Sequence, residues 1–427
     1  MTRRVAVYYA SIGASHKAAA EAICEWCGAM FPASVTMCRD VMDYVPRMMR
    51  GAIISAYNSI TRKSPWLWER LYRDTDVSSA RHPVSAFWND LHRRVSGINI
   101  KRMLKDLEAF DPHMTFATHF FGMTSFLDKW EHKSPIYFVC TDYLSHVLQR
   151  DPRFDGWFVG SDESVRQYMA DSVPTAEYAV KNFGIPISRD YLVPPTREEA
   201  RRLLEIDEHA KVAAVVDSGT GARLLDVVTG SMVDLSDWNI VIICRDNKKL
   251  YEHLRDKYFP FKNMRVLEDV PDITSYYAAS DVVILDPNGV QIAEAAAVGA
   301  AMLLMDPIAG LGRYNCDYIL ERGAARKIYE HRKTGEFLRE LIVSKESLER
   351  MKYRARAMSR PDAGMDILTW AMEKADAEDR ARELEHAKAA NSAKELEASN
   401  KEDNAGELEK PDEPQASSPK DEGEAAG

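Results

Sequence analysis

The stretch YYASIGASHKAAAEA, residues 8–22, reads as the end of a strand, a tight turn and the start of a helix. Such a turn directs backbone N–H groups and the positive end of the helix dipole toward one point, which suits an anion. Two common phosphate motifs do not fit. A dinucleotide site requires G-x-G-x-x-G, and a P-loop requires G-K-[ST], whereas Gly13 is followed by Ala14, Ser15 and His16. The stretch predicts an α/β unit with a ligand site of another kind.

Short apolar runs alternate with helical patterns along the rest of the chain. The runs are RRVAVYY, HMTFAT, PIYFVC and GWFVGS in the first half, and KVAAVV, NIVIIC, MRVLE, DVVIL and AMLLM in the second. Strands with few polar residues, interleaved with helices, indicate parallel sheets covered on both faces. One helix is expected from Asn99, as its N-cap, to Phe110. The fold class is therefore α/β, with two doubly wound sheets.

A boundary is expected at FGIPISRDYLVPP, residues 183–195, where three prolines and a glycine interrupt the pattern. We predict an N-terminal domain at 1–186, a C-terminal domain at 187–374 and a tail at 375–427. Two doubly wound domains joined there would face each other across a cleft at the carboxyl ends of their strands. Both the opening turn and DSGTGARLL, residues 217–225, belong to that edge.

The predicted tail carries most of the chain's charge. Of the net charge of −10, residues 375–427 contribute −9, from 16 acidic and 7 basic residues, so the body is near neutral. The tail has almost no large apolar residues, so it is predicted to be disordered and solubilising, with a short helix over residues 380–401 as the alternative.

The six cysteines do not suggest a disulfide framework. Cys24 and Cys27 form a C-x-x-C on a predicted helix, without a second pair at zinc-site spacing, so reduced thiols and no metal are expected. No convincing secretory signal or membrane-spanning run is apparent. The expected location is the cytoplasm.

SIGASHKAAAEAI resembles the S-x-G-x-G-H turn of monogalactosyldiacylglycerol synthases and bacterial processive diacylglycerol glucosyltransferases. The further matches follow in order over residues 5 to about 330: AYNSITRKSPWLWERLY, FATHFF, TDYLSH, DGWFVGSDE, FGIPI, CRDNKKLYEHL and SDVVILDPNGVQIAEAAAVGAAMLLMDPIAG. The resemblance implies a GT-B fold of two Rossmann-like domains. It also implies inverting transfer of a hexose from a nucleotide sugar, expected to be UDP-linked, to a membrane lipid such as diacylglycerol, with no further cofactor and no nucleic acid partner.

An inverting displacement needs a base for the acceptor hydroxyl, and histidine suits that task. His16 matches the turn histidine and is the candidate base; a helix-start histidine that only bonds the turn is the alternative. Asp142, which follows PIYFVC, is the second catalytic candidate, expected to orient the acceptor or support His16, with a helix cap as the plain alternative. The other acceptor-side candidates are Gly13, Ser15, His119 and His146.

The leaving diphosphate needs N–H donors and a helix N-terminus. The candidates for donor binding are Ser218, Gly219 and Gly221 in one turn, and Asn288, Gly289 and Gln291 at a helix start. The resemblance implies that Glu294 contacts the donor ribose; a solvent-facing helix glutamate is the alternative. Arg313 is expected to supply the positive charge near the diphosphate that a lysine provides in the resembled pattern.

Residues 47–73 mix apolar, aromatic and basic side chains. We predict membrane contact through Arg62, Lys63, Trp66 and Trp68, which would hold the protein peripherally at the inner face of the cell membrane on anionic lipid. A buried core helix is the alternative, because periodicity does not identify the side that faces solvent.

Four departures from the resembled pattern concern the site. Ser15 replaces a glycine, Asp286 replaces a lysine near the diphosphate, Leu311 replaces a glutamine that would touch the sugar, and Arg245 replaces a glycine. Three hypotheses follow: an active enzyme with a shifted donor preference, a noncatalytic GT-B protein that binds lipid or a protein partner, and a different GT-B enzyme such as a nucleotide-sugar epimerase.

Overall fold

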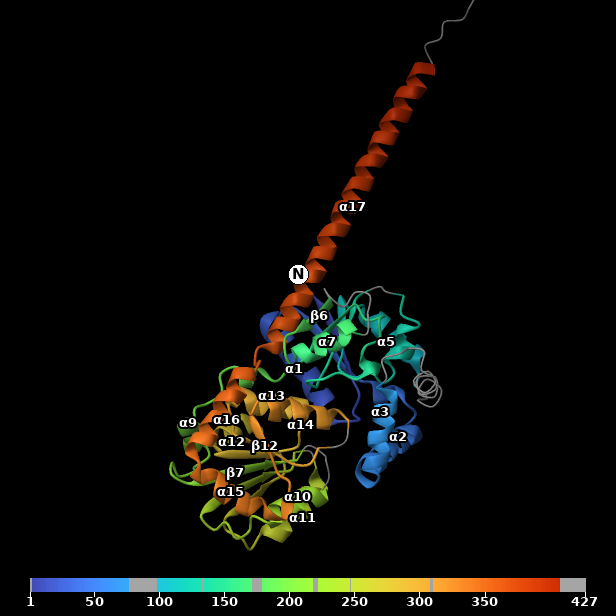
Figure 1. The fold of residues 1–427 in the computed structure, drawn as a ribbon. Helices are drawn as coiled ribbons and strands as arrows, with labels where there is room; N and C mark the ends of the chain where they lie inside the picture. The colour runs from blue at the N-terminus through green and yellow to red at the C-terminus, as the bar shows by residue number, and fades with distance from the viewer. Residues whose placement is uncertain are drawn as a thin grey trace, which may run out of the picture. The chain divides into compact units, whose positions relative to one another are not determined.

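A computed structural model describes residues 2–76, 98–131, 134–170, 179–217, 222–245, 247–307 and 310–407. By its backbone contacts the chain divides into two units, Met1–Ala371 and Met372–Gly427. The first unit holds two six-stranded sheets in which every pair of neighbouring strands is parallel (Figure 1). The α/β prediction with two doubly wound sheets is confirmed.

The first sheet has the strand order β2-β1-β3-β4-β5-β6. Its strands are β1 (Arg4–Tyr9), β2 (Val35–Asp40), β3 (Met114–Ala117), β4 (Ile136–Val139), β5 (Gly156–Val159) and β6 (Val180–Asn182). The helical segments of this part are α1 (Ala14–Met30), η1 (Val41–Tyr44), α2 (Arg47–Lys63), α3 (Pro65–Thr75), α5 (Ile100–Phe110), α6 (Met123–Leu127), η2 (Val147–Gln149) and α7 (Asp162–Ala170).

Local sequence explains these elements. Strands β3, β4 and β5 are buried along their whole length, as expected for parallel strands covered on both faces. The Asn99 side chain accepts a hydrogen bond from the Arg102 N–H, so α5 begins as predicted. Helix α1 buries Ala19, Ala20 and Ile23 on its inner side, which fixes the turn at Gly13 against the carboxyl end of β1.

The second sheet has the order β12-β11-β10-β7-β8-β9. Its strands are β7 (Lys211–Val216), β8 (Trp238–Ile243), β9 (Met264–Leu267), β10 (Val282–Leu285), β11 (Met302–Leu304) and β12 (Ala325–Lys327). The helical segments around it are η3 (Arg189–Tyr191), α9 (Arg197–Leu203), α10 (Ala222–Gly230), α11 (Lys248–Tyr258), α12 (Ile273–Ala279), α13 (Gly289–Val298), α14 (Leu311–Glu321), η4 (His331–Lys333), α15 (Thr334–Val343) and α16 (Lys345–Met358).

Two apolar clusters cover the two faces of this sheet. Ala214 and Val216 of β7 belong to a cluster with residues of α9, α12 and α13. Ala213 and Val215, which alternate with them, belong to a second cluster with residues of α10, α11 and α15 (Figure 1). This alternation follows from the two-residue period of a strand.

The C-terminal segment differs from the prediction. Composition predicts disorder from residue 375, whereas the structure describes one helix, α17, over Ala363–Glu407; residues 408–427 lie outside the described part. Its first turns bury Ile367, Leu368 and Ala371 completely. Beyond them the sequence is rich in Ala, Glu and Lys, all strong helix formers, so the helix continues without an apolar stripe.

Candidate functional site

The strand orders identify one switch point in each sheet. In the first sheet the chain moves from β1 outward to β2 and then returns to β3 on the other side of β1; in the second it moves from β7 to β8 and β9 and then returns to β10. Open α/β sheets bind ligands outside the carboxyl ends of the strands at such points. His16, Thr118 and His119 follow β1 and β3, while Asp217 and Asp286 follow β7 and β10.

His16 lies in the first turn of α1, and the residue as a whole is half-buried. Its Nδ1 donates to the Thr118 carbonyl at 2.7 Å, and the Thr141 hydroxyl oxygen lies 3.2 Å from the same nitrogen. A carbonyl only accepts, so the neutral ring carries its proton on Nδ1 and leaves the lone pair on Nε2. Burial lowers the pKa of His16 to about 4 against the pull of the Thr118 carbonyl. At neutral pH the ring is therefore uncharged and able to accept a proton.

Asp142 lies at the carboxyl end of β4, 9% exposed. Its Oδ1 accepts from Asn315 Nδ2 at 2.7 Å, and its Oδ2 lies 3.5 Å from the Thr141 hydroxyl that also approaches His16. Burial raises the pKa of Asp142 to about 6, although the hydrogen bonds from Asn315 and Thr141 oppose the rise. Asp142 is thus connected to His16 through one intervening residue.

Asn315, on α14, joins the two sheet regions. Its Nδ2 also donates to the Pro287 carbonyl at 3.3 Å, and its Oδ1 accepts from the Tyr143 N–H at 2.9 Å. Nearby, the rings of Tyr143 and Tyr318 stack with their centroids 4.5 Å apart. The β4 end of the first sheet and the β10 end of the second are therefore held together directly.

The remaining acceptor-side candidates are placed differently. His119 packs its ring edge-on against His16, with centroids 4.4 Å apart, and its Nδ1 accepts from the Phe121 N–H. His146 caps η2: its Nδ1 accepts from the Leu148 N–H at 3.1 Å, so its Nε2 donates to the Tyr72 carbonyl at 3.3 Å. Both ring nitrogens of His146 are thus occupied, which favours a positioning role for that residue.

The turn before α1 keeps an open backbone. Gly13 is exposed and is the N-cap of α1, with an extended φ of −159°. Ser15 is half-buried one residue before His16. Both residues lie beside the predicted base.

On the donor side, Asn288 caps α13. Its side-chain oxygen accepts from the N–H groups of Val290 and Gln291. The next residue, Gly289, approaches the first sheet so closely that a Cβ placed there would lie 2.1 Å from the Thr141 carbonyl oxygen. The N-terminus of α13 thus lies against the segment that carries Asp142.

Glu294 and Gln291 are both buried on α13, 7% and 1% exposed. The Glu294 carboxylate accepts from Arg245 Nη2 at 2.9 Å. Burial raises the pKa of Glu294, while the positive charge of Arg245 opposes that rise. The solvent-facing alternative for Glu294 is therefore wrong, because its side chain points into the protein and pairs with Arg245.

The remaining predicted site residues are on the donor side and in the predicted membrane-contact segment. Arg313 donates to the Glu69 carboxylate of α3 at 2.7 Å, so it is already paired. Trp66 is 68% exposed, whereas Trp68 is half-buried and packs on Tyr57, with ring centroids 5.5 Å apart. Arg62 and Lys63 lie on α2, without described side chains. Ser218, Gly219 and Gly221 lie outside the described residues.

Sequence reasoning missed the partners that hold these side chains. Thr118 and Thr141 contact His16 through a backbone carbonyl and a hydroxyl, and Tyr72 contacts His146 through its carbonyl and its ring; no motif marks such contacts. The ion pair between Arg245 and Glu294 joins residues 49 positions apart. A signal was present for Arg245, an arginine where the resembled pattern has a glycine.

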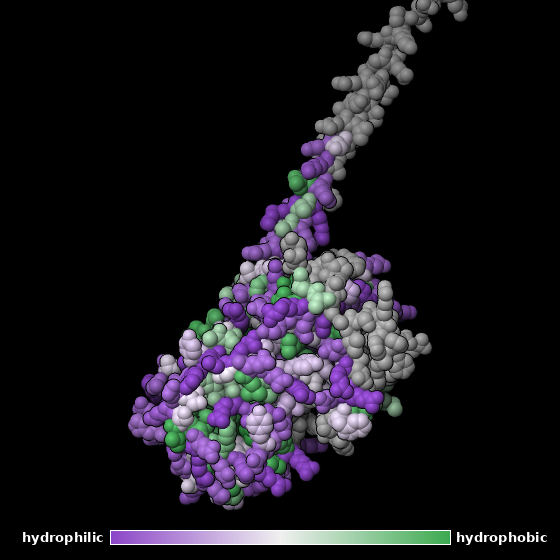
Figure 2. Space-filling view, viewed as in Figure 1, coloured by the Kyte–Doolittle hydropathy of each residue, from purple (hydrophilic) through white to green (hydrophobic). Residues whose placement is uncertain are grey.

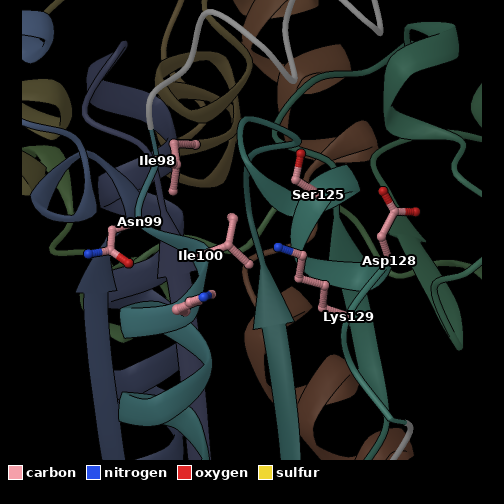
Figure 3. A pocket seen from close by; sticks show the side chains of 7 residues that line it. Ile98, Asn99, Ile100, Ser125, Asp128 and Lys129 are labelled. Carbon is pink, nitrogen blue, oxygen red and sulfur yellow. The ribbon is translucent and has the colours of Figure 1, made fainter.

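A pocket elsewhere lies between the start of α5 and α6 (Figure 3). It is lined by Ile98, Asn99, Ile100, Lys101, Ser125, Asp128 and Lys129, none of which is a predicted site residue. In the described ranges no group of His, Cys, Asp and Glu side chains has the arrangement of a metal site, and no helix there is both long and apolar enough to cross a bilayer.

No protein-family profile matches the chain. It is 24% identical over 244 residues to a processive diacylglycerol β-glucosyltransferase of Bacillus licheniformis, a match that covers 57% of this chain and 63% of the relative. It is also 24% identical over 226 residues to the enzyme of the same name in Bacillus subtilis, covering 51% and 57%. The chain is a distant homologue of the processive diacylglycerol β-glucosyltransferases. The match spans less than two thirds of either relative's own length.

Comparison with solved structures gives the fold of the chain. MurG of Acinetobacter baumannii matches with a TM-score of 0.52 and 13% identity, over 87% of this chain and 99% of MurG. A UDP-GlcNAc 2-epimerase of Neisseria meningitidis matches with a TM-score of 0.58 and 13% identity, over 87% and 100%. The chain therefore has a GT-B-like fold, as the resemblance implied.

Proposed function

We propose that the protein is an inverting glycosyltransferase that moves a hexose from a UDP-sugar to a membrane lipid such as diacylglycerol. The observation that carries the proposal is the geometry of His16, which lies at a switch point and donates from Nδ1 to the Thr118 carbonyl, so that the lone pair is on Nε2. The unprotonated Nε2 suits a general base. The distant homology to diacylglycerol glucosyltransferases supports the substrate class.

In the proposed reaction the acceptor oxygen attacks the anomeric carbon while the bond from that carbon to the phosphate oxygen breaks. The hydroxyl proton passes to Nε2 of His16, and UDP leaves with the bonding electron pair. Asp142 positions the network through Thr141. The positive end of the α13 dipole stabilises the departing diphosphate, because a helix N-terminus favours negative charge.

We further propose that the two Rossmann-like halves meet near residue 186, with the acceptor half first and the donor half second. Membrane docking is assigned to α2 and α3, where Met48 is 90% and Trp66 68% exposed. On the described part of the face in Figure 2, hydrophilic side chains predominate and hydrophobic ones are dispersed.

The test begins with nucleotide binding. We expect calorimetry to detect binding of UDP, UDP-glucose or UDP-galactose, followed by sugar transfer to diacylglycerol in vesicles. His16→Ala should abolish transfer and retain UDP binding, whereas His209→Ala, at an exposed histidine, should change neither. Full transfer by His16→Ala would refute the base assignment.

A noncatalytic GT-B protein that binds lipid or a protein partner is the second candidate. The pairing of Glu294 with Arg245 favours it, as does Leu311 at a position where a sugar-binding side chain would be polar. Vesicle binding without any nucleotide binding at millimolar concentrations would support this candidate against the first.

A further inference from the structure

Two hydrogen-bonded pairs lie at the carboxyl ends of β7 and β8 and on α13, here called the donor-side cluster: Gln291 with the Asp217 backbone, and Arg245 with Glu294. Gln291 Nε2 donates to the Asp217 carbonyl at 3.3 Å, and Arg245 donates to Glu294 at 2.9 Å. Because β7 borders the switch point of its sheet, the donor-side cluster lies where an α/β fold binds its ligand.

Arg245 is held in an unusual backbone conformation. Its φ is +49°, and in the described part of the chain only Asp111 and Glu205 share a positive φ among non-glycine residues. Residues with a Cβ rarely adopt this left-handed region. The side chain that results is mostly buried, 25% exposed, and its guanidinium reaches the Glu294 carboxylate.

Gln291 provides independent evidence of a ligand site. Its side chain is 1% exposed, and its Oε1 has no hydrogen-bond partner in the described part of the chain. Buried acceptors almost always receive a hydrogen bond. Gln291 precedes Glu294 by three residues and so shares its helix face. A ligand with hydroxyl or N–H donors would satisfy both side chains.

We propose that Arg245 competes with the donor nucleotide for Glu294 and so lowers the affinity for that nucleotide. The inference rests on the proposed function and on the contact between Glu294 and the donor ribose that the resemblance implies, in which ribose hydroxyls donate to the carboxylate. In the structure that carboxylate already accepts from Arg245. A nucleoside diphosphate therefore binds only after the ion pair opens. Its apparent affinity is the intrinsic affinity multiplied by the fraction of molecules in which the pair is open.

The opposite role for Arg245 makes the opposite prediction. If the guanidinium contacted the diphosphate, its removal would weaken nucleotide binding, because a charge-assisted hydrogen bond would be lost. The sign of the change therefore separates the two roles. A purely structural role would alter the stability of the fold without tightening the binding of any nucleotide.

The experiment is calorimetric titration of the full chain with UDP. Arg245→Gly removes the ion pair and provides the residue that prefers a positive φ; Arg245→Asn also removes the ion pair but keeps a short polar side chain that tolerates that backbone. Glu205→Gly is the matched control, since it relaxes another positive φ, of 55°, outside the donor-side cluster. The urea midpoint of each variant reports whether it is folded.

We expect both Arg245 variants to bind UDP about tenfold more tightly than the natural protein, equivalent to about 1.4 kcal/mol. Glu205→Gly should not change the affinity, and Glu294→Gln added to Arg245→Gly should cancel the gain. Equal or weaker binding by both Arg245 variants, with UDP binding by the natural protein, overturns the inference and leaves the proposed function standing. No UDP binding by any of these proteins overturns both.

Discussion

Gly289→Ala tests the closest approach between the two sheet regions. The added Cβ would lie 2.1 Å from the Thr141 carbonyl oxygen and 3.0 Å from the Asp142 Cα. Real Cβ contacts stay at or above 3.0 Å, so the start of α13 and the end of β4 must separate by about 0.9 Å. The obstacle is backbone, so no side-chain rotation relieves the overlap.

Two effects of that displacement can be measured. Overpacking of this kind destabilises a protein by about 1–3 kcal/mol, which urea unfolding detects. A misplacement of about 1 Å between catalytic groups costs on the order of 100-fold in rate. We therefore expect Gly289→Ala to unfold at lower urea and to lose about 100-fold in sugar transfer to diacylglycerol vesicles.

Gly28→Ala is the matched control. Gly28 lies on α1, and a Cβ placed there meets nothing within 4 Å. Alanine in a helix interior is favoured over glycine by about 0.5–1 kcal/mol, so this variant should be slightly more stable and fully active. A Gly289→Ala protein as stable and active as the natural chain would refute the close approach of α13 to Thr141.

Three further predictions concern a titrating carboxylate, a buried cation and the membrane surface. The pKa of Asp142 rises from 3.8 to about 6 on folding, so the native carboxyl binds a proton that the unfolded chain has released. Stability should therefore fall by about 3 kcal/mol as pH rises from about 4 to 6; subtracting the urea stability of Asp142→Asn should isolate this slope, and a flat difference would contradict it. Arg201 is 1% exposed, donates to the carbonyls of Ala279, Asp207, Glu208 and Ala210, and pairs with Asp281, so Arg201→Gln should cost about 3–5 kcal/mol of unfolding free energy. Arg197→Gln, which removes the half-exposed partner of the same carboxylate, should cost at most about 1 kcal/mol; equal losses would show that burial does not separate the two arginines. Trp66→Ala should weaken sedimentation with anionic vesicles by about 3- to 10-fold, while Phe259→Ala, at an 88% exposed aromatic after α11, should not; equal behaviour of the two would remove α3 from the proposed membrane surface.

The buried strands could be predicted from the sequence, whereas most of the strands at the sheet edges could not. Each of the nine apolar runs overlaps a strand, because strands buried on both faces need continuous apolar sequence. In the described part of the chain the unpredicted strands β2, β6 and β12 are all at sheet edges. They are short or partly exposed, as in VTMCRD of β2, so their sequences carry polar residues that conceal the strand pattern.

The site was predictable only where chemistry depends on residue type. A histidine in a Gly-containing turn and a glutamate early on a helix could be found by reading the chain. The pairing of Glu294 with Arg245 depends on tertiary placement, as does the outward direction of Trp66 compared with Trp68. Residues 218–221 carry a predicted phosphate turn that lies outside the described part of the chain.

Asn315 has a consequence for motion between the two sheet regions. An amide both donates and accepts, and here it bonds Asp142, Pro287 and Tyr143 at once. Parting the regions would break the hydrogen bonds to Asp142 and Tyr143 and admit water to Asp142, whose pKa would then return toward that of an ordinary carboxyl. Opening would therefore release a proton, and a fall in pH would hold the two regions together.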